Sequence, residues 1–187
     1  MKNDINKWRE TQRKGMLKYQ ENQRKKNLEK LKAGTLYPKQ NNNFKLRELP
    51  TNKNISWYKK ILWRWFSKYI RLRDSDKYGI CTCITCGRQH KWDSGQIHAG
   101  HYIPKNKGNA IYFNEQDVNA QCKYCNKFLH GNIGSYIIAI DIKYGPGTAT
   151  MLELKSREIK SFTTDELIQM INYYKIKVKK LLLEKEL

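Results

Sequence analysis

The chain has 187 residues, enough for one ordinary domain with appendages, and its apolar fraction of 39% supports one modest core. It carries 37 Lys and Arg against 17 Asp and Glu, and this formal net charge of +20 exceeds what solubility requires and indicates a polyanionic partner. Aromatic residues lie among these charges and no apolar run has the length of a membrane span, so nucleic acid is favoured over a membrane surface.

The first part of the chain is strongly basic. Residues 1–32 contain eleven basic and four acidic residues and are interpreted as a basic helical arm, for which a merely solvated helix and direct DNA contact are equally good explanations. Residues 33–55, with two prolines and an asparagine cluster, have the composition of a linker. The amino terminus has no apolar signal-peptide core, so we expect the protein to stay in the cytoplasm with its thiols reduced.

A helix is predicted after the linker, with Ser56 as its cap and Gly79 suited to its exit. Its apolar residues recur at alternating spacings of four and three, which is typical of a core-facing stripe. These residues are Tyr58, Leu62, Trp65, Tyr69 and Leu72.

Two more helices are predicted in the last third of the chain. Asn132 is expected to cap the first, which runs through Tyr136, Ile137, Ile140 and Ile142, stops at Gly145-Pro146-Gly147 and is followed by a strand or irregular segment. Thr163 to Glu166 fit a capping box at the start of the second. Its apolar residues keep coiled-coil spacing for two heptads, which is too few to establish a dimer, so packing on the domain is the simpler explanation. They are Leu167, Ile171, Tyr174, Val178 and Leu181.

The cysteines between these helices indicate a metal site. Cys83-Ile-Thr-Cys86 and Cys122-Lys-Tyr-Cys125 are separated by 35 residues, a good arrangement for tetrahedral zinc. Four thiolates saturate the ion, so we expect a structural site that pins both ends of the enclosed segment. Two redox dithiols are the less favoured alternative. Cys81 is left over, and it can replace Cys83 only through a poorer Cys-x-Cys knuckle.

Histidines lie close to the second knuckle. Asn126 and His130 are four residues apart, so on a helix starting near Cys122 they project from one face as half of a metal site. His98 and His101 are three apart in a strand-like run and point to opposite faces of an extended strand. We predict that one imidazole joins Asn126 and His130 around a divalent cation while the other takes a proton from water. Ordinary polar roles for these residues are the alternative.

At this point the motifs resemble a known family. CITCGR, HAGHYIP, YFNEQDVNAQC and CNKFLHGNIGSY are similar to the NinG (Rap) recombination endonucleases of lambdoid phages and prophages and, more widely, to the HNH or ββα-metal nucleases. The resemblance spans residues 56–183 and is strongest from 81 to 136. It implies a β-hairpin and a helix that grip one catalytic metal, and cleavage of branched recombination intermediates such as Holliday junctions in a bacterial host cell.

The resemblance also implies roles for single residues. His101 matches the general base of HNH enzymes, and Asn126 and His130 match the metal ligands on the helix. HNH sites commonly place a ligand directly before the base, where this chain has Gly100, so His98 is expected to supply that ligand instead.

One further position departs from the HNH pattern. Asp117 stands where the central asparagine of the motif is expected, and its carboxylate is expected to orient His101 by accepting an imidazole hydrogen bond. Asn114 and Asn119 are alternatives for that role.

The sequence therefore predicts an α+β, zinc-clipped DNA endonuclease, with its core at 56–150 and a C-terminal segment and basic helix at 151–187. Zn²⁺ is structural and Mg²⁺ or Mn²⁺ catalytic. A homing or restriction-type nuclease that cuts duplex DNA and a non-catalytic zinc DNA-binding module are the alternatives. Paired incisions at a junction favour a homodimer. Four lysines flank the proposed site as phosphate contacts or as ordinary solvated residues: Lys105, Lys107, Lys123 and Lys127.

Overall fold

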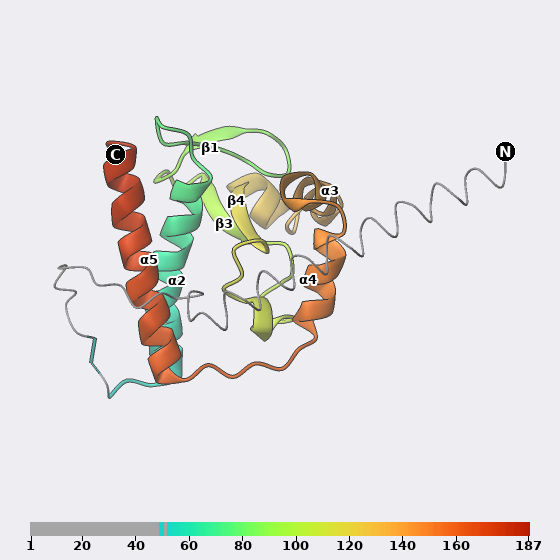
Figure 1. Ribbon diagram of the computed structural model, residues 1–187. Coiled ribbons are helices and arrows are strands. Elements are labelled where there is room, and N and C mark those ends of the chain that lie inside the picture. The colour runs from blue at the N-terminus through green and yellow to red at the C-terminus, as the bar shows by residue number, and fades with distance from the viewer. Residues whose placement is uncertain (1–48, 51) are drawn as a thin grey trace. The chain divides into compact units, whose positions relative to one another are not determined.

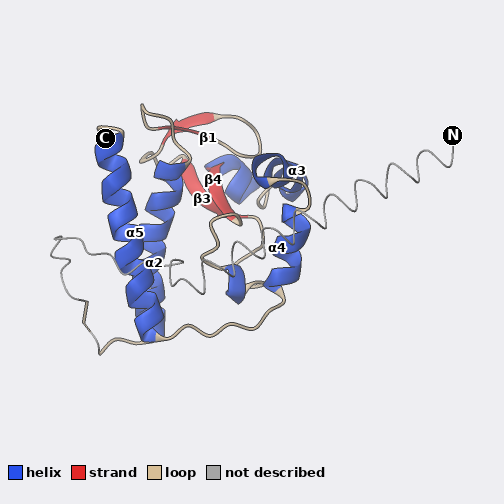
Figure 2. Cartoon of the chain, viewed as in Figure 1, coloured by secondary structure: helices blue, strands red, loops and turns tan. Residues whose placement is uncertain are grey.

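The computed structural model describes residues 49–50 and 52–187, which form a mixed α and β domain with two small antiparallel sheets (Figures 1 and 2). The predicted arm at 1–32 and most of the predicted linker at 33–55 lie outside the described residues. Within the described ranges, no helix is both long and apolar enough to cross a membrane.

Helix α2 (Ile55–Arg73) begins slightly earlier and ends earlier than the sequence predicted. Asn54, not Ser56, is its cap, because the Asn54 Oδ1 accepts a hydrogen bond from the Trp57 amide at 2.9 Å. Gly79 lies beyond the helix in the turn before β1, where its φ is 77° and a Cβ would lie 2.8 Å from the Trp92 ring. The glycine is therefore required by that turn and not by the end of the helix.

Helix α5 (Thr164–Glu184) lies beside α2 (Figure 1) and begins with the predicted capping box, in which Thr163 and Glu166 exchange hydrogen bonds. Four residues of the stripe that suggested a coiled coil are buried within the chain and the fifth, Leu181, is partly buried, so the stripe reflects packing on α2. On α2, Phe66 is fully buried and its ring packs edge-on against Tyr174, whereas Trp65 of the predicted stripe is only partly buried. The helix rotates Phe66, not Trp65, into the core.

Both sheets are formed by the segment between α2 and α3. Strands β1 (Ile80–Thr82) and β2 (Gln89–Lys91) pair through the first cysteine turn, and β3 (Ile97–His101) pairs with β4 (Val118–Cys122). The register of the second pair places Ile97 opposite Cys122 and His101 opposite Val118. Strand β4 is buried throughout and leads directly into a short π-helical turn, η2 (Tyr124–Phe128). The long β3–β4 connection contains one 3₁₀ turn, η1 (Asn109–Ile111).

Helices α3 (Ile133–Tyr144) and α4 (Thr148–Ser156) complete the domain. Helix α3 stops at Gly145 as predicted, although Asn132 makes no side-chain capping bond to its backbone. Tyr136 and Ile140 are buried, but Ile137 and Ile142 of the predicted apolar run are exposed. Only two of the four apolar residues of this run therefore pack in the core.

The strand or irregular segment expected after Gly147 is wrong, because α4 is a helix. The carboxylate of Asp141, which belongs to α3, accepts hydrogen bonds from the amides of Gly147 and Ala149 at 3.1 and 2.9 Å. The start of α4 is thus stabilised by a side chain from the preceding helix. The predicted boundary between residues 150 and 151 falls inside α4.

A polar cluster joins the end of α2 to β4 and α3. The buried Asn119 Oδ1 accepts hydrogen bonds from Arg73, Lys143 and Tyr144 at 3.0, 2.8 and 2.6 Å. Burial favours a raised pKa for Asp74, but its ion pairs with Arg73 and Lys143 lower the pKa below its usual value. These contacts fix the position of β4, the strand that leads into the second cysteine turn.

Candidate metal centre and histidine site

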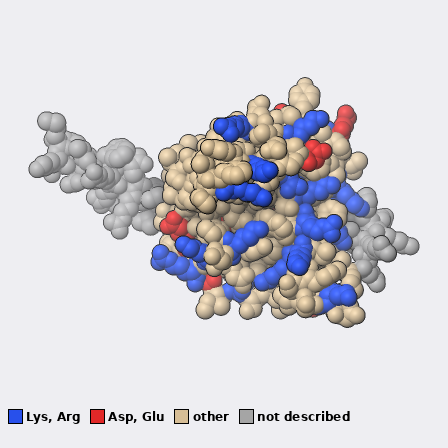
Figure 3. Space-filling view, turned by 180° about the vertical axis from the view of Figure 1, so that it is seen from behind, with Lys and Arg blue, Asp and Glu red and all other residues tan. Residues whose placement is uncertain are grey.

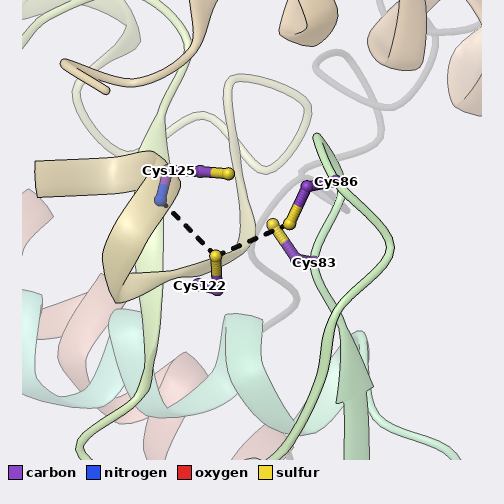
Figure 4. A group of neighbouring side chains, drawn as sticks. All are labelled: Cys83, Cys86, Cys122 and Cys125. Atoms are coloured by element: carbon purple, nitrogen blue, oxygen red, sulfur yellow. Dashed lines mark hydrogen bonds between the residues drawn. The ribbon is translucent and has the colours of Figure 1, made fainter. Parts of the chain in front are cut away.

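The four cysteines of the two Cys-x-x-Cys turns meet at one point (Figure 4). Cys83 and Cys86 come from the turn after β1, whereas Cys122 ends β4 and Cys125 lies in η2. Their sulfur atoms all lie within 4.8 Å of one another, and the Cys86 and Cys122 sulfurs are 3.7 Å apart. Ligand sulfurs on a tetrahedral zinc ion, at a Zn–S distance of about 2.3 Å, are about 3.8 Å apart. The four cysteines are therefore placed to hold a metal ion such as zinc.

The protonation of these thiols also fits a cation. Burial alone raises the pKa of Cys83, but hydrogen bonds from the Cys122 backbone and the Thr85 side chain bring it to about 7. Burial raises the pKa of Cys122 and of Cys86. Because neighbouring thiolates repel one another, the cluster favours one thiolate on its own and needs a cation to ionise the others.

Cys81 lies outside this cluster. Its thiol is fully buried and donates a hydrogen bond to the Arg71 carbonyl at 3.0 Å, on the side of β1 that faces α2. Burial raises the pKa of Cys81 to about 12, so it stays a neutral thiol. Of the two alternatives left open by the sequence, Cys83 is the one that joins the cluster.

His98 and Asn126 are in contact. The His98 Nδ1 lies 3.0 Å from the Asn126 amide nitrogen, although the two residues are 28 positions apart in sequence. An amide nitrogen only donates, so the His98 Nδ1 accepts this hydrogen bond with its lone pair, and the Asn126 atom that can hold a metal is its Oδ1. Burial lowers the pKa of His98, and the charge of Lys127 adds to this effect, so the ring is neutral at pH 7. An amide oxygen and a neutral imidazole are both acceptable metal ligands.

His130 is not on a common helix with Asn126, which corrects that part of the sequence prediction. The π-helical turn ends at Phe128, and His130 follows it as an exposed residue with φ of 48°. The chain leaves helical geometry here because the Gly131 amide turns back to donate to the Cys125 carbonyl at 2.9 Å. A ligand role for His130 stays a prediction.

His101 lies in a separate, aromatic environment at the end of β3. Its ring stacks on Trp63 of α2, with centroids 5.0 Å apart and planes inclined by 20°. Its Nε2 lies 3.0 Å from the Tyr112 carbonyl oxygen, which can only accept, so in the neutral ring Nε2 carries the hydrogen and Nδ1 keeps the lone pair. Burial lowers the pKa of His101 to about 4, an effect that the charge of Lys105 increases. The imidazole is therefore neutral at pH 7.

Asp117 does not orient His101 in the way that the sequence suggested. Its Oδ1 accepts a hydrogen bond from the Ile103 amide at 2.8 Å, its Oδ2 has no hydrogen-bond partner among the described residues, and burial raises its pKa to about 7. Asn114 caps the turn before β4 through the Gln116 amide, and Asn119 belongs to the cluster around Arg73. The group that holds the His101 ring is the Tyr112 carbonyl.

Sequence reasoning missed Trp63 and Tyr112, the residues that surround His101. Trp63 directly follows Leu62 of the predicted apolar stripe, so it lies on a second face of α2. An aromatic residue on that face, among basic residues, was the sequence signal that could have indicated a site. It also missed the reason for Gly100, whose α-carbon lies against the buried Gln121 side chain so that a Cβ would collide with its oxygen.

The four lysines near these histidines differ in their surroundings. The Lys105 ammonium lies 4.0 Å from the centre of the Trp63 ring, on the aromatic group that stacks with His101. Lys107 and Lys127 are exposed, and Lys123 is partly buried at the start of η2. Their contacts with phosphates stay predictions.

Comparison with known proteins identifies the family. The family model described as "Bacteriophage Lambda NinG protein" matches residues 2–186. Protein ninG of Escherichia phage lambda is 29% identical over 109 residues, which cover 58% of this chain and 50% of that protein. Protein ninG of Salmonella phage P22 is 28% identical over 137 residues, which cover 73% of this chain and 63% of that protein.

The chain spans about half of the lambda relative and somewhat less than two thirds of the P22 relative. No solved structure matches it. Since the family model covers nearly the whole sequence, the chain belongs to the NinG family of bacteriophage proteins.

Proposed function

We propose that this chain is a metal-dependent DNA endonuclease of the HNH type that cuts branched recombination intermediates such as four-way junctions. The observation that carries the proposal is that the two histidines of β3 have different surroundings. His98 contacts Asn126, whereas His101 stacks on Trp63 and contacts the Tyr112 carbonyl. A paired strand followed by a helical turn is also the arrangement expected of a ββα-metal core.

His101 is the proposed general base. Its Nδ1 has a free lone pair at neutral pH because Nε2 donates to the Tyr112 carbonyl, and the stack on Trp63 fixes the ring plane. A scissile phosphate beside the ring would favour the protonated form and raise its pKa from about 4 toward neutrality. The ring can then take a proton from the attacking water and keep it during bond cleavage.

His98, Asn126 and His130 are the proposed ligands of the catalytic ion, Mg²⁺ or Mn²⁺. When bound, such an ion neutralises charge on the scissile phosphate and on the leaving oxygen. Two imidazoles in the ligand set favour Mn²⁺ over Mg²⁺, since imidazole is a softer ligand than water or carboxylate. The cysteine cluster lies at the same end of β4 as His98 and Asn126, since His98 pairs with Gln121 and Asn126 follows Cys125, and it would serve only to fix these elements.

The charge of the molecule supports a DNA substrate. Figure 3 shows a band of Lys and Arg side chains across one face, with isolated acidic side chains toward its margins. Since each neutralised phosphate adds up to about 0.9 to the log-log salt slope, binding should weaken steeply with salt.

The proposal is tested by incubating the purified protein with linear, flapped and four-way DNA in Mg²⁺, in Mn²⁺ and in chelator. His101→Ala should lower cleavage by about 10²- to 10⁴-fold while zinc content and DNA affinity stay unchanged. His90→Ala is the matched control, because His90 is a partly buried histidine on β2 outside the proposed site.

Three outcomes would overturn parts of this proposal. Equal cleavage by the wild type and His101→Ala would remove His101 from the mechanism. Cutting of linear duplex as fast as four-way DNA would indicate a restriction-type or homing-type nuclease. Tight DNA binding with no cleavage in either metal would indicate a non-catalytic zinc module.

A further inference from the structure

Two exposed aromatic rings lie on η2, the turn that carries Asn126. Tyr124 and Phe128 are 48% and 64% exposed, and their ring centroids are 6.1 Å apart with planes inclined by 33°. Cys125, which follows Tyr124 on the same turn, is buried in the cysteine cluster. Because Cys125 anchors the turn from inside, both rings are held at the surface on a rigid support.

The surroundings of these rings are cationic. The Arg88 guanidinium lies 5.0 Å from the centre of the Tyr124 ring, and Lys127 is exposed on the same turn. The two segments that meet at this point, residues 77–92 and 118–140, contain no Asp or Glu at all. Aromatic faces beside positive charge, on two segments that lack acidic residues, are complementary to a polyanion that can also present flat apolar faces.

We propose that Tyr124 and Phe128 form a stacking platform for unpaired DNA bases at a branch point, with Arg88 and Lys127 as contacts for the adjoining phosphates. The inference rests on the proposed nuclease function, because it makes this platform the element that selects branched over linear DNA. Bases in a linear duplex are already stacked and must be unstacked at a cost before they can reach the rings, whereas bases at a branch are partly released. Asn126, in the same turn, would then lie beside the strand to be cut.

The experiment compares affinities for a four-way junction and for a linear duplex of the same length, measured in chelator so that cleavage plays no part. The Tyr124→Ala/Phe128→Ala variant should lose about tenfold or more in affinity for the junction and about twofold or less for the duplex. Tyr78→Ala is the matched control, because Tyr78 is 69% exposed with the Lys77 ammonium 4.9 Å from its ring centre, and lies beside the end of α5. It should change neither affinity.

Two single variants separate stacking from general apolar contact. Phe128→Trp should keep junction affinity, whereas Phe128→Leu, which is apolar but has no π-face, should lose it. Zinc content and molecular mass in sedimentation should stay at the wild-type values in all variants.

The inference fails if the double variant binds the junction as the wild type does, if both DNAs are weakened equally, or if Leu substitutes for Phe128 as well as Trp. A wild type without preference for the junction would also overturn it. A double variant that changes the oligomeric state and leaves DNA binding intact would show that the rings contact a second copy instead. By contrast, a wild type that binds junctions through these rings but cuts no DNA in Mg²⁺ or Mn²⁺ would overturn the proposed nuclease and leave this inference standing.

Discussion

Single exchanges of cysteine for serine should separate the metal cluster from the fifth cysteine. Cys83→Ser removes one of four sulfur atoms that lie within 4.8 Å of one another, and serine is a poor zinc ligand. A structural zinc site contributes about 10–16 kcal/mol at pH 7, and a whole domain is stable by only about 5–15 kcal/mol. We therefore expect Cys83→Ser to lose zinc and with it most of its folding stability.

Cys81→Ser is the matched control, because both cysteines are buried and only two residues apart. The serine hydroxyl can still donate to the Arg71 carbonyl, which the Cys81 thiol approaches to 3.0 Å. The cost should therefore be about 1 kcal/mol, typical of a modest change in a buried hydrogen bond, with one zinc ion retained per chain.

Zinc content is measured by mass spectrometry of the purified proteins, and stability by thermal unfolding with and without chelator. Loss of zinc from Cys81→Ser together with its retention in Cys83→Ser would refute the assignment of the cluster. An unchanged unfolding temperature of the wild type after complete zinc removal would refute the structural role of the ion.

Three other changes test the histidine site and the core. Trp63→Ala exposes the imidazole of His101 and should raise its pKa from about 4 toward 6.5, which moves the acidic limb of the cleavage rate upward by about two pH units in a pH–rate profile. The pKa of Asp117 is about 7 in the folded protein against 3.8 ordinarily, so the folded state binds more protons and becomes less stable as pH rises from 4 to 7. Asp117→Asn removes this loss, so the variant should gain stability relative to the wild type over that window, by about 1.4 kcal/mol per pKa unit. Urea unfolding of both proteins at pH 5 and pH 8 measures the difference. Ile171→Ala on α5 should cost about 2–5 kcal/mol without changing the sedimentation coefficient, whereas dissociation of a dimer would place this residue between chains.

Features encoded by neighbouring residues were predictable from the sequence. The capping box of Thr163 and Glu166 placed the start of α5 correctly, because both partners lie within one turn. The Cys-x-x-Cys turns likewise identified the cysteine cluster, since each turn orients its own pair of sulfurs. Gly145 ended α3 as predicted, since its φ of 106° is one that glycine readily adopts.

Features that depend on distant residues were not predictable. Helix α4 was missed because the amides at its start donate to Asp141 of the preceding helix, so the residues just before α4 include no recognisable capping residue. The partner of His101 was misassigned because the Tyr112 carbonyl, a backbone group, leaves no trace in the pattern of side chains. The stack on Trp63 joins residues 38 positions apart, so only the three-dimensional arrangement reveals it.

Through the register of β3 and β4, the cysteine cluster fixes the positions of His98 and Asn126. His98 follows Ile97, which pairs with Cys122, and Asn126 follows Cys125, so each partner in the His98–Asn126 contact is one residue away from a position tied to the cluster. If the sulfurs separate, both ends of that contact shift together. A chelator that removed a metal ion from the four cysteines should thus disturb the His98–Asn126 contact without itself touching either residue.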